Sequence, residues 1–310
     1  MPGGLAAQPP DPAGAAPRLR SFGLATLGLM LCFAWPLWSL IGFAARSQFY
    51  SYILLIPFIS FYLVWQGRKN PSPAAPPAEG LTAGFLTAGA LVLAAYWLLL
   101  RSRWKLTEDD YLAVMMPAFL LFFAGICGRF LGGAFLRAHV FPLGLLVFMV
   151  PMPTAALQGV DMFLQYSSAA VACAFFTVSG TSFLQDGLVF QLPDITLQIA
   201  PECSGIHSSL VLFITSLLAA HLFLHTPWKR AVFILAVIPL GILRNGFRVY
   251  TIGELCIHIG PRMINSPIHH KGGPIFFALS LIPLFLLLIV LQKSERSRVK
   301  PTTKPEGRPN

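Results

Sequence analysis

Long apolar stretches recur along almost the whole chain and restrict what it can fold into. Eight of them, each near the length that a bilayer core requires, can be marked out in the 310 residues. They lie at about 22–45, 49–66, 81–100, 111–128, 138–152, 204–224, 231–252 and 274–292. With 55% hydrophobic and 11% charged residues, the composition is far from that of a soluble domain. The sequence therefore predicts an all-α polytopic membrane protein with about eight transmembrane helices.

The two ends of the chain differ from the apolar region between them. Residues 1–20 are rich in Pro, Ala and Gly and have no apolar period, which predicts a disordered tail. Residues 293–310 form a second, basic tail. Between them we expect one integral membrane domain over 21–292, whose first apolar stretch is an uncleaved signal anchor.

The region 153–180 decides the orientation, because it is moderately apolar but contains polar residues such as Asp161 and Gln165. If it does not cross the membrane, one side holds 14 of the 22 Lys and Arg residues. If it crosses, the Lys and Arg residues that follow it change sides, and this majority is lost. Positive charge stays cytoplasmic, which favours an interfacial or re-entrant segment and two cytoplasmic termini. Topology thus explains the net charge of +10 better than nucleic-acid binding does.

An alternating segment leads directly into a cysteine at the start of an apolar helix. From Leu188 to Ile199 hydrophobic and polar residues roughly alternate, and Pro193-Asp194 is a turn signal, so we expect a short β-hairpin on the outer face. Cys203 then lies at a helix N-terminus, where unpaired N–H groups and the helix dipole favour a thiolate. The alternative is a buried structural cysteine.

Two arginines lie near the outer end of the seventh apolar stretch. Arg244 and Arg248 share a helical face at i, i+4, where like charges repel unless an anion lies near them. Alternatively, both extend to the lipid headgroups. Asn245 adds a neutral hydrogen-bonding group, and an Asn-x-x-Arg pair suits the binding of a carbonyl or oxyanion. The predicted topology brings these side chains to the same face as Cys203.

The loop before the last apolar stretch contributes histidines. His269 or His270 could exchange protons with a cysteine nucleophile, and either could equally be an exposed loop residue without a role. Cys203 and His207, spaced i, i+4, could bind zinc together with His269 or Glu202. No HExxH pair supports that alternative. A charged Glu202 would oppose a thiolate, so we expect its side chain to point elsewhere or to pair with an arginine.

Several motifs in a fixed order resemble the exosortase and archaeosortase family of membrane cysteine proteases and transpeptidases. They are PMPTAALQGVD, LQYSSA, DGLVFQLPDITLQIAPECSGIHSS, LRNGFRV and HHKGG, within about Phe141 to Leu291. The resemblance implies that Cys203, followed by Ser204 and Gly205, is the nucleophile of a Cys-Ser-Gly motif. It further implies that Arg248 is the arginine of Asn-x-x-Arg, after Asn245, and that His269 begins His-x-x-x-Gly.

The resemblance also implies a location and a substrate class. Such enzymes lie in the cytoplasmic (inner) membrane, act on its outer, periplasmic face and need no cofactor or metal. Their substrates are secreted proteins with a short C-terminal sorting signal, typically around Pro-Glu-Pro, then a single span and a basic tail; the product passes to water or to a cell-surface acceptor. Two features differ or stay open: His207 stands where relatives often carry Arg, and either His269 or His270 can be the family histidine.

Two other classes of protein use the same residues differently. A non-enzymatic transporter or polysaccharide-export component would bind an anionic substrate with Arg244 and Arg248. A zinc-dependent membrane hydrolase would use Cys203 as a ligand. A transporter tolerates Cys203→Ala, whereas a thioacyl enzyme does not, and stoichiometric metal would identify the hydrolase.

Overall fold

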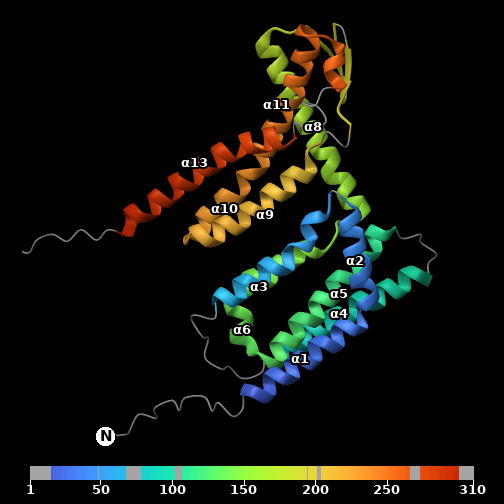
Figure 1. Ribbon diagram of the computed structural model, residues 1–310, viewed down its shortest axis with the longest axis vertical. Coiled ribbons are helices and arrows are strands. Elements are labelled where there is room, and N and C mark those ends of the chain that lie inside the picture. Colours follow the sequence, from blue (N-terminus) through green and yellow to red (C-terminus); the bar gives the residue numbers. More distant parts are fainter. Residues whose placement is uncertain are drawn as a thin grey trace, which may run out of the picture. The chain divides into compact units, whose positions relative to one another are not determined.

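The computed structural model describes residues 15–47, 49–67, 78–101, 107–193, 195–200, 204–265 and 273–299, shown in Figure 1. Within these ranges the chain is almost entirely helical, with one small sheet. Six helices are long and apolar enough to cross a membrane, or up to eight if each of two bent pairs forms one span. These numbers confirm the predicted all-α polytopic fold. The chain divides into two compact units, Met1–Ala156 and Leu157–Asn310.

The first unit consists of helices only, in the part that the structure describes. Its elements are α1 (Ala15–Cys32), α2 (Ala34–Arg46), η2 (Ser51–Leu54), α3 (Ile56–Gly67), α4 (Glu79–Arg101), α5 (Glu108–Phe130), α6 (Gly132–Ala138), α7 (Val140–Leu145) and η3 (Leu146–Met149). α1 begins within the predicted N-terminal tail. The expected span at 22–45 is bent by 70° at Phe33, and a helix pair over Gly132–Met149 is bent by 70° at His139, where the expected span at 138–152 begins. Each is therefore a broken span or a re-entrant loop rather than one straight helix.

The closest packing in this unit joins α4 and α5 through glycines. A Cβ atom at Gly125 would lie 2.9 Å from Leu86 Cδ2, and one at Gly89 would lie 3.1 Å from Phe122 Cζ. Small residues let two apolar helices approach closely where no hydrophobic effect drives them together. The kink residue Phe33 packs edge-on against Phe119 of α5, with ring centroids 5.7 Å apart. This contact holds the junction of α1 and α2 against α5.

The second unit contains a sheet and the remaining helices. They are α8 (Thr154–Ser179, which begins in the first unit), β1 (Leu184–Asp186), β2 (Val189–Leu192), β3 (Ile195–Gln198), α9 (Ile206–Phe223), α10 (Pro227–Leu235), α11 (Val237–His258), η5 (Pro261–Asn265) and α13 (Gly273–Val299). α8 is continuous over 26 residues and is a candidate span by length and composition, so it lacks the break of a re-entrant segment. Its polar residues pair along the helix, because Gln165 Nε2 donates to Asp161 Oδ2 over 2.9 Å.

The predicted hairpin is present, and a third strand, β1, extends it to a three-stranded sheet. β2 and β3 pair antiparallel with Phe190 opposite Leu197, and β1 pairs antiparallel on the other side of β2. Pro193 lies in the turn between β2 and β3, as expected, and Asp194 is outside the described residues. β1 was not predicted, because its three residues are all exposed and show no alternation.

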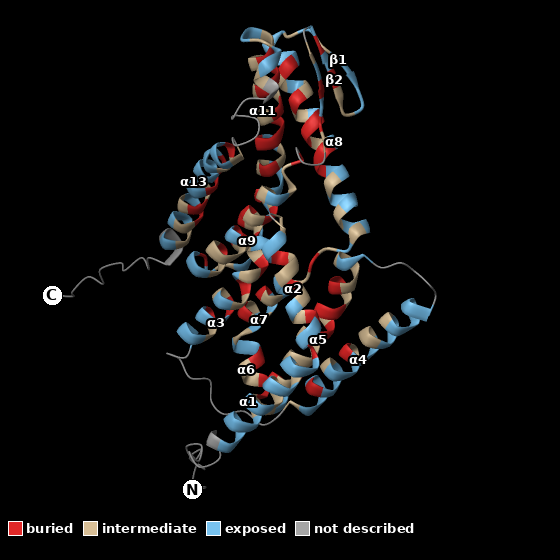
Figure 2. Cartoon of the chain, turned by 45° about the vertical axis from the view of Figure 1, so that its right-hand side comes forward, coloured by how far each residue is buried: buried red, intermediate tan, exposed pale blue. Residues whose placement is uncertain are grey.

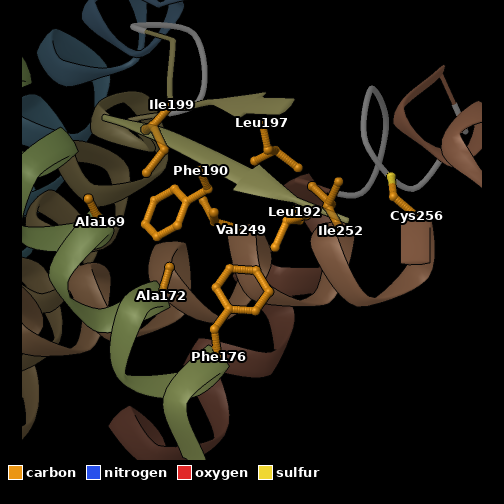
Figure 3. Packing of buried hydrophobic residues seen from close by; sticks show 10 residues of the cluster. All are labelled: Ala169, Ala172, Phe176, Phe190, Leu192, Leu197, Ile199, Val249, Ile252 and Cys256. Carbon is orange, nitrogen blue, oxygen red and sulfur yellow. The ribbon is translucent and has the colours of Figure 1, made fainter. Parts of the chain in front are cut away.

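One face of the sheet packs on α8 and α11. Figure 3 shows Phe190 and Leu197 of the sheet directed toward Phe176 of α8 and toward Val249 and Ile252 of α11. Figure 2 shows buried residues along α8 and α11 beside exposed ones, and many of the exposed residues in the helices are large and apolar. Apolar residues that face outward fit a lipid environment. The alternating pattern of β2 and β3 thus serves to fix the sheet on two helices.

Candidate active site

The turn before α9 follows Cys203 directly in the chain. Gly205 caps α9 with a φ of 73°, in the left-handed region that glycine adopts without strain. Its carbonyl accepts hydrogen bonds from Ser209 N over 2.9 Å and from Ser208 Oγ over 3.0 Å. Ser204, the residue next to Cys203, is only 1% exposed. The backbone on the C-terminal side of Cys203 is therefore buried and held.

Arg244 holds this turn from α11. Its Nη2 donates to the Gly205 carbonyl over 3.3 Å and to Ser209 Oγ over 3.2 Å. α9 and α11 are close here, since a Cβ atom at Gly241 would lie 2.9 Å from Ser209 Oγ. Arg244 is only 7% exposed, so it does not extend to lipid headgroups. The structure thus gives Arg244 a tethering contact between two helices that are far apart in the sequence.

Asn245 connects the same turn to α8. Its Nδ2 donates to Ser168 Oγ over 3.0 Å, and both residues are buried. A Cβ atom at Gly205 would lie only 2.9 Å from Asn245 Oδ1. The neighbouring Gly246 brings the helices together, because a Cβ atom there would lie 2.5 Å from Val171 Cγ1. Three helices therefore meet at the residue pair that follows Cys203.

Arg244 leaves hydrogen-bonding capacity at this place. Arg244 Nη1 is buried and has no hydrogen-bond partner among the described residues, and no described carboxylate forms an ion pair with Arg244. Arg248 lies one turn further along α11 and is half-buried. A buried guanidinium favours an anionic or oxyanionic partner, because leaving it unpaired costs free energy. The cluster can therefore bind a group that develops negative charge.

Other predicted site residues lie elsewhere or outside the described ranges. Glu202, Cys203, His269 and His270 fall outside the described residues, so their expected roles stay predictions. A further histidine on the same helix as the arginines, His258, does not join the cluster. It ends α11 about 15 Å from Arg248, from the rise of 1.5 Å per residue, and its Nε2 lies 3.1 Å from Glu254 Oε2.

The zinc alternative stays untested, because Cys203, Glu202 and His269 lie outside the described residues. The described helix α9 begins at Ile206. His207 itself is exposed in the first turn of α9. Among the described residues no group of three or more His, Cys, Asp or Glu side chains could hold a metal ion.

Two serines of the cluster were not expected as site residues. Ser168 and Ser209 contact Asn245 and Arg244 through their hydroxyl groups. Both lie in quoted motifs, Ser168 in LQYSSA and Ser209 at the end of the Cys203 motif, and Gly241 and Gly246 flank the two polar residues of α11 and mark places of close helix contact. Such glycines show where helices approach one another, but not which hydroxyl groups they approach.

The sequence profile of transmembrane exosortases (Exosortase_EpsH) matches residues 38–286, which include this cluster and most of the helices. The chain belongs to this family. No curated protein and no solved structure matches it. Family membership supports a general role as a membrane protease or transpeptidase of the cysteine type.

Proposed function

We propose that this exosortase cleaves the C-terminal sorting signals of secreted proteins at the outer face of the cytoplasmic membrane. The substrate span binds beside the helices, and the sorting signal reaches Cys203. In this proposal α8 does not cross the membrane and both chain termini are cytoplasmic, and the product is released to water or to an amine or hydroxyl acceptor at the cell surface. The observation that carries this proposal is the buried contact of Arg244 and Asn245 with the turn that follows Cys203.

The chemistry follows from the residue types. The Cys203 thiolate attacks the scissile carbonyl carbon and forms a C–S bond, and the oxygen becomes an oxyanion. The guanidinium of Arg248, with the amide of Asn245, stabilises that oxyanion. The C–N bond then breaks as His269 gives a proton to the leaving amine. His269 next takes a proton from water or the acceptor, which attacks the thioester and releases the Cys203 thiolate.

Arg244 has a supporting role in this scheme. Its Nη2 is already engaged by the Gly205 carbonyl and Ser209, so its first task is to fix the turn. Ser204, Gly205 and their neighbour His207 set the backbone around the nucleophile. Because nucleophile and oxyanion donors must be held within fractions of an ångström, the packing of this turn limits the rate.

The test measures cleavage of a tagged secreted protein that carries a sorting signal, a span and a basic tail, co-expressed with the chain. Cys203→Ala should abolish cleavage. Arg248→Lys keeps the charge but loses the planar fork, and should lower the rate about 10²- to 10³-fold, as loss of an oxyanion donor does.

Arg262→Lys is the matched control, because Arg262 is exposed in η5 and outside the cluster, so it should cleave normally. Cleavage by the Cys203→Ala variant would refute a cysteine mechanism and favour the metal alternative. Normal cleavage by Arg248→Lys would refute the role of its guanidinium.

A further inference from the structure

β3 is an edge strand that leads toward the nucleophile. In the sheet order β1-β2-β3 only one side of β3 is paired, and that side faces β2. β3 ends at Gln198, five residues before Cys203. Five residues span at most about 18 Å when fully extended, so the unpaired side of β3 lies within that reach of the nucleophile. A strand edge of this kind can hydrogen-bond any extended peptide backbone.

The register shows which backbone groups face the unpaired side. Ile199 N donates to Leu188 O over 3.0 Å, and the register makes these two residues directly opposite each other. Opposite residues of an antiparallel ladder alternate between hydrogen-bonded and non-hydrogen-bonded pairs. Leu197 therefore exchanges hydrogen bonds with β2, whereas Thr196 and Gln198 direct their N–H and C=O groups away from it.

The available groups are few and well defined. The Gln198 carbonyl accepts a hydrogen bond from Ala200 N over 3.1 Å, which ends the strand edge there. The Gln198 N–H and both backbone groups of Thr196 have no further partner among the described residues. Both residues are exposed, whereas Leu197 and Ile199 are buried against the helices, as Figure 3 shows. The core thus holds the strand in place while its outer edge is accessible.

We propose that this edge binds the extended sorting signal of the substrate as an additional β-strand and aligns it with Cys203. The inference rests on the proposed function and names the surface that receives the substrate. A scissile bond must lie in an extended, accessible segment, and an edge strand selects that conformation. One substrate residue opposite Thr196 exchanges two hydrogen bonds with it, and a third bond forms at the Gln198 N–H.

This arrangement also accepts prolines at alternate positions of the substrate. Proline has no N–H, so in a strand it is tolerated where that group would face away from its partner. When the residue between two prolines lies opposite Thr196, the backbone nitrogens of both prolines face away from β3, where no N–H group is needed. A Pro-x-Pro segment such as Pro-Glu-Pro therefore pairs with this edge without the loss of a hydrogen bond.

The first test removes one outward N–H with a matched control. Thr196→Pro deletes the donor on the open side and leaves the bonds between β2 and β3. Gln185 is the equivalent residue of β1. It lies opposite Phe190, whose backbone groups bond to β3, so the backbone N–H and C=O groups of Gln185 face away from β2. We expect Thr196→Pro to lower the initial cleavage rate of the tagged substrate about tenfold. A factor of this size corresponds to the loss of one hydrogen bond whose net free energy lies at the upper end of the usual range.

Gln185→Pro should cleave normally, because it changes the other edge of the sheet. Normal cleavage by Thr196→Pro would overturn the docking proposal, and so would an equal loss in Gln185→Pro. If Cys203→Ala still cleaves, or if the unsubstituted chain does not cleave, the proposed function itself fails, and the docking proposal fails with it.

A second measurement does not depend on the folding of a proline variant. A photoreactive p-benzoylphenylalanine replaces Gln198, whose side chain is exposed, in a Cys203→Ala background where the substrate stays intact. Illumination should cross-link the tagged substrate to this position. The same residue at Gln185 should give no such product. Cross-linking from Gln185 alone, equal yields from both positions, or no cross-link from either would place the substrate elsewhere.

Discussion

The substitution Gly205→Ala tests whether the turn beside Cys203 controls catalysis. Gly205 has a φ of 73°, which costs a residue with a Cβ atom roughly 1–2 kcal/mol. The new Cβ would also lie 2.9 Å from Asn245 Oδ1 and 3.2 Å from Arg244 Nη2. Displacement of these two side chains weakens two or three hydrogen bonds, each with a net value of about 0.5–1.5 kcal/mol. The turn should therefore be destabilised by about 2–5 kcal/mol.

Gly180→Ala is the matched control for the backbone strain. Gly180 has a φ of 74°, and nothing lies within 4 Å of a Cβ atom built there. The two variants thus share the conformational cost, and only Gly205→Ala has the steric conflict. We expect Gly205→Ala to lower the cleavage rate at least about tenfold, because a loss of about 1.4 kcal/mol corresponds to a factor of ten. Gly180→Ala should cleave nearly normally.

The assay is the gel shift of the tagged substrate, read as an initial rate, together with thermal unfolding of the purified protein in detergent. A double variant with Asn245→Ala should show coupling, because removal of Oδ1 relieves the conflict that the new Cβ creates. Equal cleavage rates for Gly205→Ala and Gly180→Ala would refute the reasoning. Strictly additive effects in the double variant would show that Asn245 does not limit the turn.

Two further predictions concern α11. Arg244→Lys keeps a positive charge but loses the planar guanidinium that reaches Gly205 and α9. The cleavage rate should therefore fall about tenfold with little change in the amount of folded protein. An unchanged cleavage rate would show that Arg244 is not a supporting residue. Gly253→Ala should lower the unfolding temperature, because the new Cβ would lie 2.5 Å from Phe176 Cζ. Gly159→Ala, where nothing lies within 4 Å, is its control, and equal unfolding temperatures would contradict the close packing of α8 and α11.

Most helices of this protein could be predicted because they are long apolar stretches. The expected spans at 81–100 and 111–128 lie inside α4 and α5, which extend them by one to three residues at each end. The bends at Phe33 and His139 were not foreseen, since hydropathy measures how apolar a stretch is and not whether it is straight. The region 153–180 was expected to be interfacial or re-entrant from the distribution of positive charge, and α8 is a continuous helix in which Gln165 bonds to Asp161 one turn earlier.

The sequence by itself determined the membrane character, the β2–β3 hairpin and the order of the motifs around Cys203, because each depends on neighbouring residues. Only the tertiary structure decided that Arg244 contacts Gly205 and that Asn245 contacts Ser168, which is 77 positions away. The alternation of hydrophobic and polar residues in β3 also does not show which backbone groups of β3 remain unpaired beside β2. Such contacts depend on how closely helices and strands approach, and that distance is set by packing between distant segments rather than by any one of them.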